Sequence, residues 1–300
     1  MTLTRWAALV AAGLVSACGG GGGGDGPTGP QPIRTTMQGP STTKDYNASS
    51  AAFRFELVGA TDKGIEAVDA GSLVTITTDS KGYITNLAID TNTANVGFFG
   101  EGQPLGPPGG GVPSNADVLN DLAAGVKEVL SGEAGSYGIA ILDLNHSMFG
   151  GWVITDSAPG GWDGRAGVFA FGVETATMPA TGEATYNGTA MGVGVTGSQR
   201  YAFAGDAQVK ANFAGMTVQT TFSNLNYHNV INNDTGTLAT LSGSGTITGH
   251  KYSGTISGGS GTINGTVQGA FYGPGAAETA GVFQATGGGT TLMGSYGAKK

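Results

Sequence analysis

The sequence predicts a mainly β protein, in which an eight-stranded antiparallel barrel follows a smaller sheet that carries one α-helix. Glycine occupies 57 of 300 positions and charged residues make up only 11%, a composition that suits twisted strands and tight turns better than helices. Apolar and polar residues alternate over many short segments, as they do in half-buried strands. From Thr181 onward the chain consists only of such segments and Gly-rich turns.

The first element, residues 1–18 (MTLTRWAALVAAGLVSAC), has the pattern of a targeting segment. Arg5 supplies the positive charge, and the apolar run at 6–15 is too short for a permanent membrane helix. The stretch Leu14–Cys18 resembles the lipobox of bacterial lipoproteins, which implies cleavage before Cys18 and lipid attachment to it. The alternative is an ordinary signal peptide that is cut after Ala17.

Residues 19–50 begin with six glycines and contain almost no apolar side chains. Such a segment cannot bury enough apolar surface to fold, so we expect a disordered Gly/Pro-rich tether. Together with a lipid on Cys18, this tether would hold a folded body away from a membrane surface.

The next range, 51–178, is predicted to be a β domain with one helix. Strands are expected at 53–58, 73–78, 83–90, 137–144, 151–155 and 167–173. The segment 114–131 has apolar residues at helical spacing, and Ser114 and Asp117 match the pattern of a helix N-terminal cap.

The last range, 179–300, contains eight strand candidates with short Gly-rich connections. Eight antiparallel strands can close into a barrel that is filled by its own side chains. The candidates are 183–190, 201–213, 217–222, 237–247, 251–256, 262–272, 279–285 and 291–296.

Three stretches of this part, 172–188, 265–288 and 294–300, resemble the β-barrel domain of transferrin-binding protein B and related surface lipoproteins of Gram-negative bacteria. The resemblance implies that 51–178 is the handle sheet that precedes each barrel. It also implies a lipid-anchored protein on the outer face of the outer membrane, with a role in iron acquisition. The full transferrin-binding protein has two lobes and this chain has room for one. Because single-lobe relatives bind haemoglobin, haem or complement regulators, the resemblance implies binding and not a named ligand.

The most specific of these stretches is FYGPGAAETAGVF (271–283). Pro274 has no N–H to offer a neighbouring strand, and Gly275 can adopt a positive φ. We therefore interpret the stretch as a barrel corner and not as an active site. Glu278 is either a ligand contact or a carboxylate at the barrel rim that meets turn N–H groups or a lysine.

No catalytic pattern is present in the sequence. Residues 192–197 match G-x-G-x-x-G but lead into the strand-like segment QRYAFAG, whereas a dinucleotide site requires a following helix. The histidines, His146, His228 and His250, lack metal-ligand spacing. The net charge of −8 and the lack of a basic stretch argue against nucleic-acid binding. We expect no enzyme activity, no cofactor and no bound metal.

Two segments are candidate binding sites. VGFFGEGQPLGPPGGGVPS (96–114) contains Phe98 and Phe99, which either anchor a partner or end a strand and pack on the handle. SNLNYHNVINND (223–234) contains Tyr227 and His228, either a pair that contacts haem iron or exposed residues of a hairpin loop.

The leading hypothesis is a monomeric surface lipoprotein that binds a protein or another iron-bearing ligand. The alternatives are haem or haemoglobin binding, a structural or protective envelope lipoprotein without a dedicated ligand, and an integral outer-membrane barrel. The last is least favoured, because most strand candidates are shorter than the 9–11 residues, roughly, that a membrane strand needs.

Overall fold

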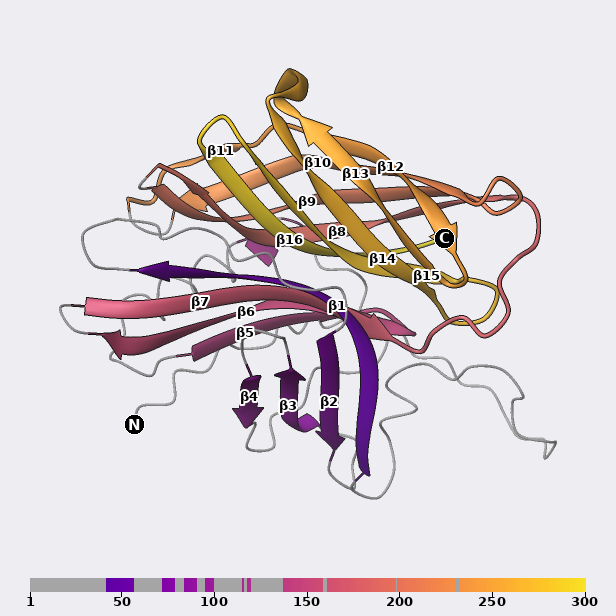
Figure 1. Ribbon diagram of the computed structural model, residues 1–300, viewed down its shortest axis with the longest axis horizontal. Coiled ribbons are helices and arrows are strands. Elements are labelled where there is room, and N and C mark those ends of the chain that lie inside the picture. The colour runs from indigo at the N-terminus through magenta and orange to yellow at the C-terminus, as the bar shows by residue number, and fades with distance from the viewer. Residues whose placement is uncertain are drawn as a thin grey trace, which may run out of the picture.

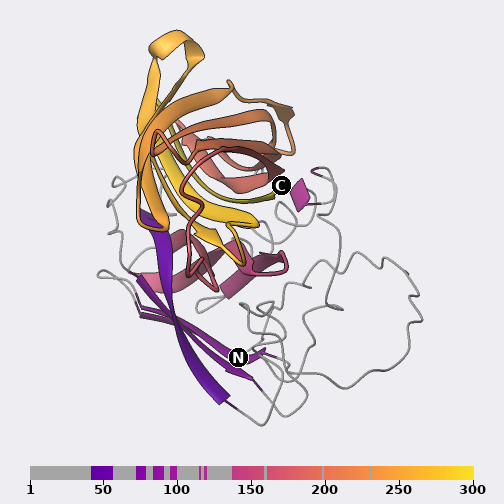
Figure 2. The same cartoon turned by 90° about the vertical axis from the view of Figure 1, so that its right-hand side faces the viewer.

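The strands of the computed structural model form an open sheet and a closed barrel that lie face to face (Figure 1). The structure describes residues 42–56, 72–78, 84–90, 95–99, 115, 118–119, 137–158, 161–197, 199–229 and 232–300. Seven strands form the open sheet, and the remaining strands belong to the barrel. Figure 2 views the barrel nearly along its axis, with the open sheet below it.

The open sheet, which we call the handle, has the strand order β4-β3-β2-β1-β7-β6-β5 with every neighbouring pair antiparallel. Its members are β1 (Thr42–Glu56), β2 (Ser72–Thr78), β3 (Ile84–Asp90), β4 (Asn95–Phe99), β5 (Tyr137–Asp143), β6 (Ser147–Ala158) and β7 (Gly161–Gly172).

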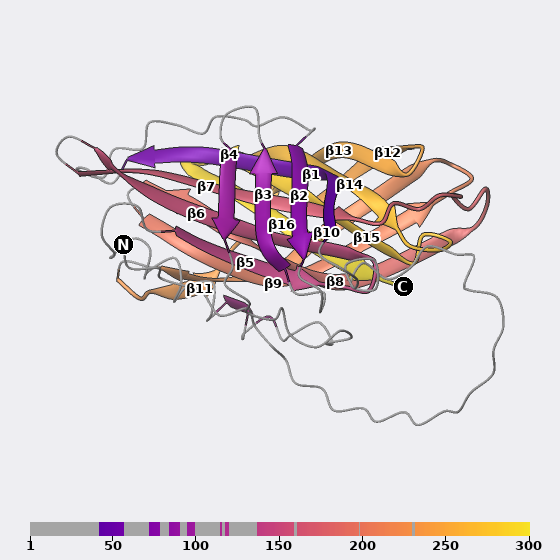
Figure 3. The same ribbon diagram turned by 90° about the horizontal axis from the view of Figure 1, so that it is seen from below.

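Strand β1 joins the two halves of the handle. Its first part, from Thr42 to Ala48, pairs with β2, and its second part, from Ser49 to Glu56, pairs with β7. Figure 3 shows β2, β3 and β4 running across the direction of β5, β6 and β7, so β1 carries the chain from one half to the other.

The barrel is an up-and-down arrangement of eight antiparallel strands, closed by pairing between β9 and β10. The short strand β11 pairs with the end of β10, and a single turn of 3-10 helix, η1 (Gly259–Gly261), connects two of the strands. The barrel strands are β8 (Glu183–Thr196), β9 (Gln199–Asn212), β10 (Thr217–Asn229), β12 (Leu241–Thr248), β13 (Lys251–Gly258), β14 (Ile263–Tyr272), β15 (Glu278–Gly287) and β16 (Thr290–Lys299), and β11 spans Thr235–Thr237.

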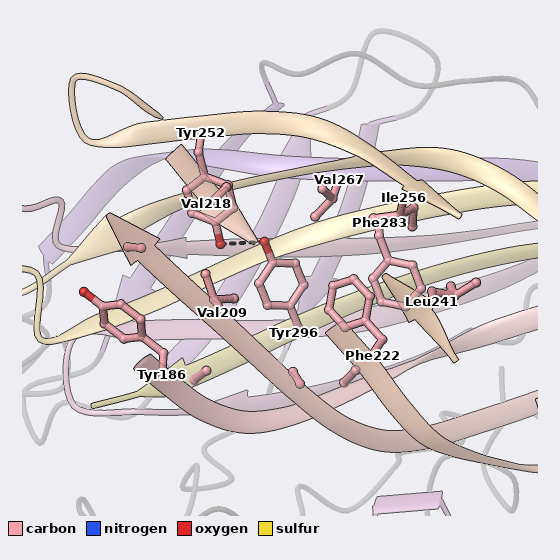
Figure 4. Packing of buried hydrophobic residues seen from close by; sticks show 14 of the residues in the cluster. Tyr186, Val209, Val218, Phe222, Leu241, Tyr252, Ile256, Val267, Phe283 and Tyr296 are labelled. Carbon is pink, nitrogen blue, oxygen red and sulfur yellow. Dashed lines mark hydrogen bonds between the residues drawn. The ribbon is translucent and has the colours of Figure 1, made fainter. Parts of the chain in front are cut away.

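Aromatic and aliphatic side chains fill the barrel interior (Figure 4). The rings of Phe222 and Phe283 stack with their centroids 4.2 Å apart. The hydroxyl of Tyr252 lies 2.6 Å from that of Tyr296 and 2.8 Å from that of Thr279, so these polar atoms are satisfied within the core.

The barrel wall formed by β8, β9, β15 and β16 is apolar on its outer side as well as its inner side. Outward-facing residues such as Met191, Ala202, Ala204, Val282 and Met293 are no more than 2% exposed. They pack in one cluster with Leu142, Phe149 and Val168 of the handle. By contrast, β12 and β13 alternate buried residues with exposed Ser, Thr and Lys. Among the described residues, the handle therefore packs on the side of the barrel formed by β8, β9, β15 and β16.

The expected strands in the handle and the eight in the barrel are confirmed, although several are longer than predicted and β4 is an additional strand. Strand β1 begins at Thr42, inside the range 19–50 that we predicted as tether. That prediction relied on low apolar content. In the structure, small residues such as Ala48 and Ser50 are nevertheless buried, because the first half of β1 pairs with β2 and the second half with β7. Strand β10 continues to Asn229, and β4 occupies the start of the predicted connection 96–114.

The predicted helix 114–131 falls mostly outside the described residues. Of its members that the structure describes, Asn115, Val118 and Leu119 are helical. Val118 is buried in the cluster between the handle and the barrel, and Leu119 packs beside it. In the chain these residues lie between β4 and β5, and we count them as part of the handle.

Candidate binding site

Tyr227 and His228 lie in a strand and not in a hairpin loop, which corrects the prediction for 223–229. Both belong to the last part of β10, which pairs with β9 on one side and with β11 on the other. The ring of Tyr227 is half-buried against the barrel core, with its centroid 5.1 Å from that of Tyr201. The loop prediction failed because the Asn-rich composition favours turns locally, whereas two neighbouring strands supply backbone partners.

A β-bulge separates this end of β10 from the rest of the strand. The register between β10 and β9 shifts between Ser223 and Asn226, and Asn224 has a φ of 51°. Gly205 of β9 makes room for the bulge, because a Cβ there would lie 2.6 Å from the carbonyl oxygens of Ser223 and Asn224. Bulges re-aim the side chains that follow them, and here those are Asn226, Tyr227 and His228.

Amide side chains hold the connection from β10 to β11 against the barrel rim. Asn229 is 2% exposed and its side chain donates to Oε1 of Gln199. The Nδ2 of Asn232 donates to Asp234 at 2.6 Å, and the backbone N–H of Asn229 donates to the carbonyl of Asp234 at 2.7 Å. These bonds fix a polar rim that is rich in amide side chains, a surface suited to hydrogen bonding with a protein.

Phe98 and Phe99 end strand β4, which is the outermost strand of the handle sheet. Figures 1 and 3 show β4 on the side of the handle that faces away from the barrel. The side chains of both residues, and Cys18, lie outside what the structure describes. The strands that carry the Phe98–Phe99 pair and the Tyr227–His228 pair belong to different sheets and are therefore not neighbours.

The stretch 271–283 forms the corner between β14 and β15, as predicted. Gly273 and Gly275 have φ values of 74° and 59°. The carboxylate of Glu278 is 2% exposed and accepts the backbone N–H groups of Asn145 and His146 at 2.8 Å each. This confirms the alternative in which Glu278 meets turn N–H groups.

The described histidines do not converge on one site. His146 lies in the turn between β5 and β6, His228 lies in β10, and His250 lies in the turn between β12 and β13. The Nε2 of His250 lies 3.1 Å from a carboxylate oxygen of Glu174. Within the described ranges, no group of three His, Cys, Asp or Glu side chains has the spacing of a metal site.

The G-x-G-x-x-G match at 192–197 spans the end of β8 and the following turn, and β9 begins at Gln199. It joins two strands, so it lacks the helix N-terminus that a dinucleotide phosphate requires. In the part of the chain that the structure describes, no helix has the length and apolar character needed to cross a membrane.

Sequence reasoning missed the polar contact between the handle and the outer barrel wall. Asn115 donates to Oδ1 of Asp206 at 2.6 Å and accepts from the hydroxyl of Thr189 at 3.1 Å. The other oxygen of Asp206 accepts from Nδ2 of Asn224 at 2.6 Å. The signal in the sequence is a single Asp in an otherwise apolar and small-residue segment, YAFAGDA (201–207).

Solved structures with similar folds cover much of this chain. They include a double mutant of transferrin binding protein B from Haemophilus parasuis Hp5, 15% identical, covering 84% of this chain and 44% of that chain with a TM-score of 0.44. Isotype 1 of the same protein from serogroup B Neisseria meningitidis is 16% identical, with coverages of 84% and 43% and a TM-score of 0.40. The N-lobe domain of lactoferrin binding protein B of Moraxella bovis is 12% identical, with coverages of 85% and 99% and a TM-score of 0.43.

This chain spans less than half the length of the first two of these proteins. No curated protein matches the sequence. Residues 178–300 match the family model of the C-lobe and N-lobe beta barrels of Tf-binding protein B. In the structure, the matched range contains all eight strands of the closed barrel. Residues 178–300 thus form a closed β-barrel that matches the family of Tf-binding protein B barrels.

Proposed function

We propose that this protein is a non-catalytic surface lipoprotein that captures an iron-bearing protein of the transferrin and lactoferrin class. The observation that carries the proposal is the match of residues 178–300 to the barrels of Tf-binding protein B. Solved proteins with similar folds are described as binding transferrin or lactoferrin. The ligand, the anchor and the location at the outer membrane are parts of the proposal.

The packed barrel interior supports a ligand that binds outside it. Phe222, Phe283 and Tyr296 are each no more than 1% exposed and occupy the middle of the barrel. A planar cofactor such as haem would have to displace these rings, at a cost of several buried aromatic side chains. Capture of haem alone is therefore a weaker alternative than capture of a whole protein.

The amide-rich rim around Tyr227 and the edge strand that carries Phe98 and Phe99 are the proposed contact regions. Tyrosine with neighbouring Asn side chains provides a rigid aromatic surface and adaptable hydrogen bonds, the chemistry common in protein-binding loops. Because the two regions are apart, we propose that they contribute independently to binding.

Binding assays with the chain from residue 19 onward test the function. Immobilised protein is exposed in turn to iron-loaded transferrin, iron-loaded lactoferrin, haemoglobin and free haem. We expect saturable binding of transferrin or lactoferrin, and weaker binding by Tyr227→Ala and by Phe98→Ala with Phe99→Ala. Tyr227→Ala should also lower thermal stability, because its half-buried ring packs against the barrel core. Exposed Asn264→Ala, at the far end of β14 from the corner, is the control. Failure of all four probes would contradict the proposal and favour a structural envelope protein.

The anchor is tested separately in cells. We expect the wild-type protein to partition with membranes and Cys18→Ser to lose that partitioning, because the thiol that would carry the acyl chains is gone. Thr4→Ala, in the same segment but outside Leu14–Cys18, is the control. An unchanged membrane fraction for Cys18→Ser would remove the lipid from the proposal.

A further inference from the structure

We propose that Asp206 is a positioning residue for partner binding, through which the handle holds the end of β10 in its binding conformation. The inference rests on the binding function proposed above and deepens it. It adds that the surface that contacts the partner runs from Asn224 along the outward side of β10 and β11, and that the handle controls its shape.

The first step is that Asp206 is bound from two directions. Its Oδ1 accepts from Asn115 of the handle, and its Oδ2 accepts from Asn224 of β10, each at 2.6 Å. Both bonds are charge-assisted; the bond from Asn115 is partly buried, and the bond from Asn224 is exposed to solvent. One carboxylate thus links the segment of Asn115 to strand β10.

The second step is that Asn115 is itself fixed. Its Oδ1 accepts from the hydroxyl of Thr189 at 3.1 Å. Val118, one helical turn further on, is 4% exposed and packs in the apolar cluster between the handle and the barrel. The position of Asn115 therefore reports whether the handle is docked on the barrel.

The third step is that Asn224 determines how β10 continues. It adopts a left-handed backbone conformation inside the bulge, which costs about 1 kcal/mol for a residue with a side chain. The hydrogen bond to Asp206 compensates for that strain. Loss of the bond would favour a regular strand, and a one-residue change of register would exchange the inward and outward faces of Asn226, Tyr227 and His228.

The surface controlled in this way is polar and weakly charged. Asn226 is exposed and His228 half-buried on the outward side of β10, and Thr235 and Thr237 are exposed on β11. The hydroxyl of Thr237 donates to Asn226 at 2.8 Å. Amides and hydroxyls of this kind suit a folded protein that presents its own hydrogen-bonding groups, and not a highly charged polymer.

Two substitutions separate the two sides of Asp206. Asn115→Ala removes the bond from the handle and leaves the bulge residue unchanged. Asn224→Ala removes the bond from β10 and leaves a residue with a side chain at the positive φ, so the strain that the bond offsets remains. The control is Gln208→Ala, on the same outer face of β9, which removes a hydrogen bond between carboxamides, Gln208 to Asn187 at 2.9 Å, away from the bulge.

The experiment measures amide hydrogen exchange at residues 224–229 and affinity for iron-loaded transferrin, with iron-loaded lactoferrin as a second probe. We expect both variants to exchange faster at these amides and to bind about tenfold more weakly, while Gln208→Ala matches the wild type. The two changes combined should cost less than the sum of their separate effects, because they act through one carboxylate.

Wild-type exchange and affinity in both variants would overturn the role of Asp206. A wild-type chain that binds neither probe contradicts the binding function instead, and the exchange measurement then still reports whether Asp206 holds the bulge. If Asn115→Ala binds more weakly but residues 224–229 do not exchange faster, the inference is also overturned. The loss of affinity would then not result from a change in β10.

Discussion

The carboxylate of Glu278, at the start of β15, accepts the backbone N–H of His146, in the β5–β6 turn of the handle, at 2.8 Å. The other carboxylate oxygen accepts the N–H of Asn145, and the Ser147 hydroxyl donates to the first at 3.0 Å. Glu278 is almost fully buried, so this carboxylate joins the barrel corner to the handle in a place that water does not reach. It is a structural connection and not a ligand contact.

We expect Glu278→Gln to destabilise the protein by about 3 kcal/mol, because an amide NH₂ would face N–H donors and leave buried groups unpaired. Chemical denaturation measures the free energy of unfolding. Glu183→Gln is the control, since its carboxylate accepts only an exposed bond from Asn212, and we expect it to change stability by less than about 0.5 kcal/mol. Equal effects of the two substitutions would contradict the structural role of Glu278.

Stability is expected to fall steeply in alkaline solution. Burial raises the pKa of Tyr252 to about 12 from the ordinary value of 10.0, and burial also raises the pKa of Tyr296. Between pH 10 and pH 12 the unfolded chain loses the Tyr252 proton while the folded protein keeps it. The contribution of protonated Tyr252 to the free energy of unfolding is therefore complete below pH 10 and is lost as the pH rises towards 12.

In Tyr252→Phe the fall of stability with pH should be shallower by up to about 1.4 kcal/mol per pH unit. The measurement is chemical denaturation at a series of alkaline pH values, with phenolate absorbance to follow ionisation. At neutral pH we expect a loss of about 1 kcal/mol from the missing hydrogen bonds. Tyr227→Phe, whose ring lies at the rim, is the matched control. An identical pH dependence in wild type and Tyr252→Phe would exclude this residue as a cause.

The pair formed by Gly245 and Gly254, directly opposite each other in β12 and β13, should not accept larger residues. A Cβ on Gly254 would lie 2.1 Å from the carbonyl oxygen of Ser244 and 2.5 Å from the Cα of Gly245. We expect Gly254→Ala to lower the free energy of unfolding by about 2 kcal/mol, because the backbone must shift. The neighbouring exposed Ser253→Ala should have little effect, and a similar loss in both would disprove the packing argument.

The segment 179–300 is predicted to fold without the handle, because it contains every strand of the closed barrel. Its unfolding, followed by circular dichroism, should be cooperative. The apolar outer wall that includes Met191, Val282 and Met293 would become exposed, so we also expect self-association in sedimentation experiments. A product without cooperative unfolding would show that the barrel depends on the handle.

Part of the fold could be predicted from the sequence because strands leave a local signal. In DAQVKANF (206–213) every second residue is apolar, and β9 buries Ala207, Val209 and Ala211 on the inner side as the alternation predicts. Gly-rich turns marked most of the strand ends. The bulge at Asn224 leaves no such signal, because its conformation depends on a bond to Asp206 of another strand. The alternation therefore predicts a strand that ends at Phe222, whereas β10 continues to Asn229.

The sequence by itself determined the alternating strands, the corner at Pro274 and the family of the barrel, because these depend on neighbouring residues. Only the tertiary structure decided that the handle covers β8, β9, β15 and β16, and that Glu278 meets a turn 132 residues earlier in the chain. The physical reason is that Glu278 binds backbone N–H groups, which every residue except proline has. No side-chain pattern at Asn145 and His146 identifies their partner, so the fold alone brings them together.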